Sequence, residues 1–149
     1  MTGFWQWALE SYARPGAAEA CLALQNEHGQ NVPLVLWVVW ASRASRPPDI
    51  ARGAALARAW EAAAVAPLRT ARRSLRSPVA DLPDDARERF RAEVKATELA
   101  GERVLMDALE ALPPSGEAPA KEDALLAAAA QSWGAPAPPE VFELLLGRL

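Results

Sequence analysis

The stretch from Asn31 to Ala44, NVPLVLWVVWASRA, decides the fold of this 149-residue chain. Its apolar side chains, from Leu34 to Trp40, cover every side of a helical wheel, which is typical of an element that is buried all round. The valines would also suit a buried strand, but no other segment alternates with a period of two to pair with it. We therefore predict a central buried helix over residues 32–44, capped by Asn31.

Apolar residues recur at helical spacing on both sides of this stretch. Upstream they predict helices over residues 4–14 and 15–28, joined by a tight corner at Pro15 and Gly16. Downstream, a long helix begins after Asp49 and is kinked at Pro67, and another begins near Pro83 and continues to residue 112. The chain is therefore predicted to be all-α, with residues 1–112 forming a compact bundle of about five helices around the central one.

Residues 113–149 are predicted to be an addition to that bundle. Prolines, serine and glycine make residues 113–121 a linker by composition, and two short helices, over residues 122–133 and 140–149, form a C-terminal appendage. The appendage is too apolar for a free tail, so it must dock on this chain or on another one. We expect self-association through it or through a tryptophan-rich face, and deletion of residues 113–149 is expected to change the oligomeric state or lower the solubility.

Composition excludes several classes of protein. The chain contains 34 alanines, which favour helices and argue against disorder. A single cysteine, Cys21, excludes an internal disulfide, and with a single histidine, His28, no zinc site can be assembled from Cys and His. No secretory signal is visible, and the longest apolar run, residues 32–41, is too short to cross a bilayer. We therefore expect a cytoplasmic protein with no membrane partner and no cofactor.

Charge is unevenly distributed along the chain. The net charge is −3, but residues 1–80 carry +4 and residues 81–149 carry −7, which suits packing of the two halves or of two copies. The acidic total argues against nucleic acid as the main partner. Arg69, Arg72, Arg73 and Arg76 nevertheless form a basic run, of which all but Arg72 are expected to face solvent. The alternative is a docking surface for an acidic partner, a phosphate or RNA.

The helix expected over residues 83–112 places a carboxylate on its apolar side. Its stripe runs from Phe90 to Leu112, and Glu98 lies inside that arc with Glu102 one turn further along. A carboxylate there must be paired, hydrogen-bonded or neutralised. We favour a structural salt bridge between Glu98 and Arg72. The alternative is a paired-carboxylate site for acid–base work or a divalent ion.

Histidine and tryptophan offer two weaker candidates. His28 lies in the last turn of its helix, where a histidine offsets the helix dipole, so we favour a structural role over a ligand or acid–base role. Six tryptophans are many for this length, and we expect core packing from them, although an aromatic pocket between helices could hold a small apolar ligand. No nucleotide-binding or nucleophile motif occurs, so no catalytic residue is predicted.

Several blocks of the sequence resemble those of a known family. They are Phe4-Trp5-Gln6-Trp7, Tyr12 to Gly16, Cys21 to Gln25, His28-Gly29, Trp40, Pro67 to Arg73 and Lys95 to Arg103. The family comprises short bacterial proteins catalogued only as a domain of unknown function, and the resemblance covers about residues 4–112. It implies a compact, cytoplasmic, helical protein and brings no activity with it. Together with Trp40, the residues it marks as candidate binding residues are Gln25, His28, Arg69, Arg72, Glu98 and Glu102.

The favoured function at this point is a non-enzymatic protein-interaction or adaptor module that forms a homo-oligomer or binds a protein partner. The apolar appendage and the complementary charges of the two halves support it. One alternative is a small-molecule-binding bundle or an enzyme, with Glu98, Glu102, Arg72 and His28 lining an aromatic pocket. The other is association with RNA or the ribosome through the arginine run.

Overall fold

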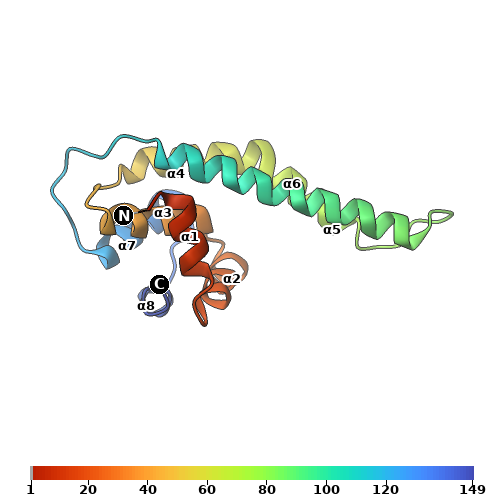
Figure 1. The fold of residues 1–149 in the computed structure, drawn as a ribbon, viewed down its shortest axis with the longest axis horizontal. Coiled ribbons are helices and arrows are strands. Elements are labelled where there is room, and N and C mark those ends of the chain that lie inside the picture. The colour runs from red at the N-terminus through yellow and green to blue at the C-terminus, as the bar shows by residue number, and fades with distance from the viewer. Residues whose placement is uncertain (1) are drawn as a thin grey trace.

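The computed structural model describes residues 2–149, which contain helices and no strand (Figure 1). The elements in chain order are α1 (Phe4–Tyr12), α2 (Ala17–His28), α3 (Val32–Arg43), α4 (Ile50–Trp60), η1 (Glu61–Val65), α5 (Ala66–Ser74), α6 (Asp84–Glu110), α7 (Glu122–Trp133) and α8 (Pro139–Leu146). Because α4, η1 and α5 follow one another without a break, they form one long helix. The all-α fold is confirmed, and a helix occurs in every segment where one was predicted.

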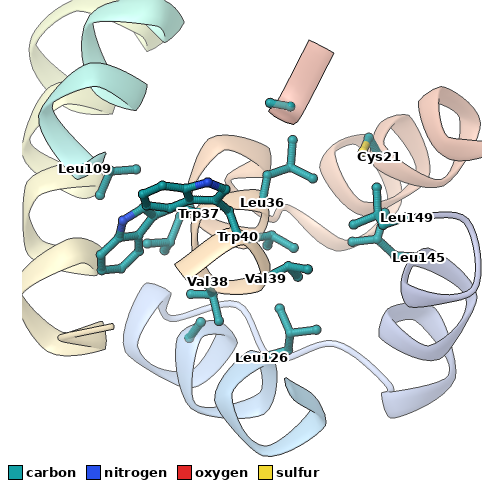
Figure 2. Close-up of a cluster of buried hydrophobic side chains, with 14 of the residues drawn as sticks. Cys21, Leu36, Trp37, Val38, Val39, Trp40, Leu109, Leu126, Leu145 and Leu149 are labelled. Atoms are coloured by element: carbon teal, nitrogen blue, oxygen red, sulfur yellow. The ribbon is translucent and has the colours of Figure 1, made fainter. Parts of the chain in front are cut away.

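The central helix α3 is buried as its sequence predicts. Every residue from Pro33 to Ala41 is buried, and the Oδ1 atom of Asn31 accepts a hydrogen bond from the Leu34 amide at 3.0 Å. Side chains from the surrounding helices converge on α3 (Figure 2). Trp40 packs against Phe4, with ring centroids 5.5 Å apart. The α4 backbone comes so close to Trp37 that a Cβ atom on Gly53 would collide with the indole ring.

The C-terminal segment belongs to the same hydrophobic core. Helix α7 packs on α3 and α4, while α8 packs on α2 and α7. Leu126, Phe142, Leu145 and Leu149 are buried in the cluster that surrounds α3. An ion pair between Arg43 and Glu122, at 2.9 Å, joins the end of α3 to the start of α7. The appendage therefore docks on its own chain, and most of its apolar side chains are buried there.

The long helix changes geometry just before Pro67. Pro67 has no N–H, and its ring would clash with the carbonyl of Ala63 four residues earlier in a regular α-helix. The five residues of η1, Glu61–Val65, form a π-helical turn at this point. Such a turn relieves the clash and shifts all later side chains by about one residue, or roughly 100°, around the helix axis.

The hairpin of α5 and α6 projects from the rest of the molecule (Figure 1). Helix α6 has 27 residues, about 40 Å at 1.5 Å per residue. Its C-terminal half packs on α1 and α3, whereas its N-terminal half lies beside α5 alone. Phe90, predicted on the core stripe, is consequently 56% exposed. The core ends before it reaches this part of the helix.

Among residues 2–149, no helix has both the length and the apolar character needed to cross a membrane.

Candidate functional site

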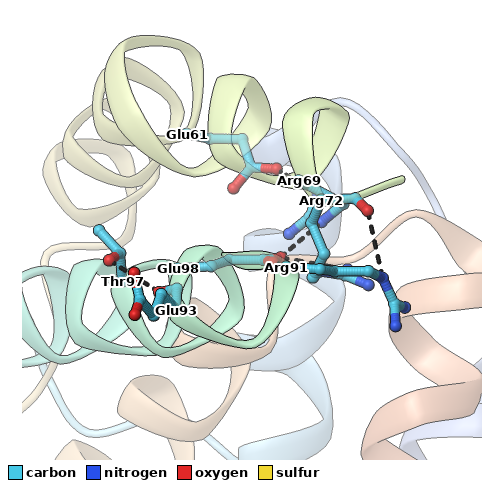
Figure 3. Close-up of polar contacts among 7 residues, drawn as sticks. All are labelled: Glu61, Arg69, Arg72, Arg91, Glu93, Thr97 and Glu98. Carbon is cyan, nitrogen blue, oxygen red and sulfur yellow. Dashed lines mark hydrogen bonds and ion pairs between the residues drawn. The ribbon is translucent and has the colours of Figure 1, made fainter. Parts of the chain in front are cut away.

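An ion-pair network joins the long helix to α6 (Figure 3). The Glu98 carboxylate has a side chain only 7% exposed and accepts hydrogen bonds from Arg72 Nε at 2.6 Å and Arg69 Nε at 3.3 Å. Arg69 also pairs with Glu61, 2.8 Å away. The ion pair predicted between Glu98 and Arg72 is therefore present, and Glu98 is fully engaged by two guanidinium groups.

Arg69 does not face solvent, and that prediction is wrong. Its side chain lies between Glu61 and Glu98, where burial lowers its pKa but the two carboxylates raise it more, so the net pKa is raised. The π-turn explains the error, because the register shift that it introduces carries Arg69 round to the α6 side. Of the basic run, Arg73 and Arg76 are exposed, so two of its four guanidinium groups remain for contact with a phosphate or RNA.

Glu102, one turn after Glu98, differs from it in having no partner. No ion pair or side-chain hydrogen bond within residues 2–149 engages its carboxylate, although the side chain is partly buried. Burial raises the pKa of Glu102 above its ordinary value of 4.5, repulsion from Glu98 raises it further, and Arg69 opposes the shift. The fold therefore holds a carboxylate in surroundings that do not stabilise its charge.

An apolar groove of about 400 Å³ opens beside Glu102. It lies between α1, α2, the start of α3 and α6, and its wall includes Trp5, Leu9, Tyr12, Leu22, Leu99 and Met106. The volume falls within the range of about 300–1,000 Å³ that is common for ligand sites. Glu102 is the one charged residue among the described residues that line the groove, and no lysine or arginine lines it.

A smaller polar pocket of about 100 Å³ adjoins the groove. Gln25, Val32, Pro33 and Glu102 line both spaces, so these residues mark the boundary between them. Arg69 and Glu61 line the polar side. The Gln25 amide, like the Glu102 carboxylate, makes no side-chain hydrogen bond in the part of the chain that the structure describes. Two unengaged polar groups thus lie at the boundary between the apolar groove and the polar pocket.

Two titratable groups on the opposite wall, Tyr12 and Cys21, have raised pKa values. Burial raises the pKa of the Tyr12 phenol, and Cys21, Glu102 and Glu19 raise it further by repulsion. Burial raises the pKa of the Cys21 thiol to about 11, so the thiol stays protonated and is a poor nucleophile at neutral pH. The groove is therefore apolar and electronegative, and it lacks an activated nucleophile.

His28 and Trp40 lie outside the site. His28 is partly exposed in the last turn of α2, its carbonyl accepts a hydrogen bond from Gln30 Nε2 at 3.3 Å, and it lines neither space. Trp40 is buried, and its Nε1 donates to the Thr2 carbonyl at 3.1 Å. Both residues serve the fold in this geometry. The structure brings together Gln25, Arg69, Arg72, Glu98 and Glu102 from the candidate list.

Sequence reasoning missed Glu61 and Tyr12. Glu61 stands eight residues before Arg69, a spacing that does not pair side chains in a regular α-helix, and only the π-turn brings them together. Tyr12 belongs to α1 and lines the same groove as Glu102 because α1 packs on α6. No local sequence signal could have revealed that either residue belongs to the site.

The arrangement can bind but offers little for metal chemistry. No group of three or more His, Cys, Asp or Glu side chains within residues 2–149 is placed to hold a metal ion. The paired-carboxylate alternative is not supported by the geometry, because Glu98 is engaged by Arg69 and Arg72. What remains free is one carboxylate, one amide and an apolar wall.

Comparison with known proteins identifies a family and no individual relative. Residues 3–109 match the family model described as "Protein of unknown function (DUF2390)", which agrees with the resemblance seen in the sequence. No curated protein and no solved structure matches the chain. The matched region contains α1 to α5 and nearly all of α6, and therefore every residue of the Glu98 network and the Glu102 groove, whereas α7 and α8 lie beyond it. The chain thus belongs to the DUF2390 family of proteins of unknown function.

Proposed function

We propose that this protein is a non-enzymatic binding protein whose groove between α1, α2, α3 and α6 holds the apolar part of a small amphipathic molecule. The observation that carries this proposal is the groove itself, about 400 Å³ in volume, with an apolar wall and two unengaged polar groups at its boundary with the polar pocket. Apolar concave sites with a few converging polar groups are where proteins bind small molecules. The protonated Cys21 thiol and the engaged Glu98 support binding in preference to catalysis.

The exposed rim of the groove supports the same proposal. Leu9, Tyr12, Leu22 and Leu99 are each between 41% and 55% exposed although they are large and apolar. Together they form an open apolar patch in the body of a protein whose other large side chains are mostly buried. Patches of this kind mark binding sites, and covering them with a ligand would release the water that they now contact.

Octanol is a suitable neutral probe of this groove. We expect it to bind with one site per chain and a Kd on the order of 0.1–1 mM, since each buried methylene contributes about 0.8 kcal/mol against the cost of association. Leu99→Glu should weaken binding by about tenfold or more, because it puts a charge on the apolar wall. Isothermal titration calorimetry measures both values.

Leu144→Glu is the matched control for this experiment. Leu144 is 54% exposed, close to the 55% of Leu99, but lies on α8 away from the groove. The Leu144→Glu variant should bind octanol with the same Kd as the unmodified protein. Absence of octanol binding to the unmodified protein, or equal losses in both variants, would contradict the proposed groove.

The second candidate function is the interaction module expected from the sequence, now with a second copy of the chain as partner. Trp40 and most apolar side chains of the appendage are buried in the chain's own core, so these side chains are not available for the contact. The projecting hairpin instead exposes Val79, Leu82 and Phe90 near its end. The hairpin end carries exposed arginines, Arg73, Arg76 and Arg89, and exposed carboxylates, Asp81, Asp84, Asp85 and Glu88, so the ends of two copies can meet with opposite charges facing each other.

Self-association through the hairpin predicts a concentration-dependent mass above 16.0 kDa in sedimentation equilibrium. Phe90→Ser should weaken the association by about tenfold or more, because it removes the largest exposed apolar side chain of the hairpin. Leu144→Ser, which changes an equally exposed residue on α8, should leave the association unchanged. A monomer at every concentration would rule out this second candidate.

A further inference from the structure

We propose that the groove selects apolar cations, and specifically that Glu102 and Gln25 together bind a primary ammonium group carried on an apolar chain. This inference rests on the proposed function, since it names the chemical class of the ligand that the groove takes. Three observations support it: the Glu102 carboxylate has no ion-pair partner within residues 2–149, Gln25 lines the same boundary, and no lysine or arginine lines the groove.

Glu102 has an unsatisfied capacity to bind a cation. Its carboxylate has no ion-pair partner within residues 2–149, and it lines both the groove and the polar pocket. The neighbouring guanidinium groups are committed elsewhere, because Arg72 pairs with Glu98 and Arg69 with Glu98 and Glu61. A cationic ligand could therefore form with Glu102 the ion pair that no side chain of the described residues forms with it.

Gln25 adds an acceptor at the same place. It comes from α2, on the other side of the groove from α6, and it also lines both spaces. Its amide oxygen can accept a hydrogen bond, and an ammonium group has three N–H donors to give. An ammonium group at the boundary, where Gln25 and Glu102 line both spaces, leaves the groove for the apolar chain and does not enter the side of the polar pocket that Arg69 lines.

The charge of the wall excludes the opposite type of ligand. No lysine or arginine lines the groove, whose one charged lining residue among those described is Glu102, and Arg69 in the adjoining pocket is paired with Glu61 and Glu98. A fatty acid would place its carboxylate near Glu102, and the guanidinium group of the adjoining pocket, Arg69, already pairs with two carboxylates. An alkylammonium ion keeps its proton until about pH 10.4, as a lysine side chain does, and carries the sign that the site requires.

The proposal can be tested with octylammonium, octanol and octanoate, which share one apolar chain and differ in the charge of the head group. Isothermal titration calorimetry of the full chain at neutral pH should give octylammonium a Kd about tenfold or more below that of octanol, because a hydrogen bond to a charged group adds to the apolar contact. Octanoate should bind more weakly than octanol. In Glu102→Gln, octylammonium should lose this preference and octanol should keep its affinity.

Glu93→Gln is the control, since it makes the same chemical change on α6 at an exposed position outside the groove. It should leave all three affinities unchanged. Equal binding of octylammonium and octanol by the unmodified protein would overturn the cation site while leaving the groove intact. Failure of all three probes would overturn both. If Glu93→Gln lost the preference for octylammonium over octanol as fully as Glu102→Gln does, the preference would come from the overall surface charge. That result would also overturn the cation site.

Stability separates this binding role from a structural one. Because burial and Glu98 both disfavour the charged form of Glu102, Glu102→Gln should unfold at a urea concentration equal to or above that of the unmodified protein. A structural carboxylate would give the opposite result. Should Glu102→Gln fail to fold, the site would be structural and the proposal would be wrong. Glu102→Asp should retain part of the preference for octylammonium, because the negative charge is kept.

Discussion

Deletion of residues 113–149 is expected to abolish cooperative folding of the remaining chain. The deletion removes Leu126, Phe142, Leu145 and Leu149, all of which are buried in the cluster around α3. Each such side chain contributes about 1.5–3 kcal/mol on burial, so the four together contribute about 6–12 kcal/mol. That sum is comparable to the whole stability of a domain of this size, about 5–15 kcal/mol. The same deletion would expose the apolar side chains of α3 and α4 that α7 now covers.

Urea denaturation followed by near-ultraviolet circular dichroism is the measurement for this prediction, since it reports the packing of the buried tryptophans. The truncated chain should show no cooperative transition and low solubility. A chain with residues 116–120 replaced by glycine and serine keeps α7 and α8 and should unfold as the unmodified protein does. If residues 1–112 unfold cooperatively at the same urea concentration, the core does not depend on α7 and α8.

A single substitution within the C-terminal segment gives a graded version of the same result. Leu126 is completely buried, so Leu126→Ala should lower the free energy of unfolding by about 2–5 kcal/mol. Leu144, which is exposed on α8, should tolerate the same change within about 0.5 kcal/mol. These values distinguish loss of packing from a general effect of altering the C-terminal helices.

Glu98→Gln is expected to lower the free energy of unfolding by about 3–5 kcal/mol, the typical cost of removing one member of a buried ion pair. The Glu98 side chain is 7% exposed, and those of Arg69 and Arg72 are 19% and 16% exposed, so solvent does little to compensate. Arg69 would retain Glu61 as a partner, whereas Arg72 would lose the partner that it now binds at 2.6 Å. Equilibrium urea unfolding measures the change.

Two further variants test whether the cost comes from the ion pair. Glu93→Gln on the exposed face of the same helix should change stability by no more than about 0.5 kcal/mol. Glu98→Leu combined with Arg72→Met replaces the charges with apolar groups and should recover part of the lost stability, since a buried pair costs much to desolvate. A Glu98→Gln protein as stable as the unmodified one would mean that the network does not hold α5 against α6.

The sequence alone determined the helices of this protein and the location of its core. The continuous apolar run from Leu34 to Trp40 could be satisfied only by burial on all sides, and α3 lies at the centre for that reason. Local signals also placed helix ends, because Asn31 and Asp49 cap the backbone amides that follow them. The burial of Glu98 and its pairing with Arg72 could likewise be predicted, since a carboxylate on an apolar face needs a cation from the neighbouring helix.

Only the tertiary structure decided which side chains meet at the groove and where the C-terminal helices dock. The π-turn at Glu61–Val65 rotated Arg69 toward Glu98, and a helical wheel of constant pitch cannot anticipate that rotation. The groove joins Tyr12, Gln25 and Glu102 from three helices whose separation depends on packing across the whole core. Helical periodicity specifies which face of a helix is buried, but it carries no information about which helix covers that face. For that physical reason the free carboxylate of Glu102 could be recognised only once the fold was known.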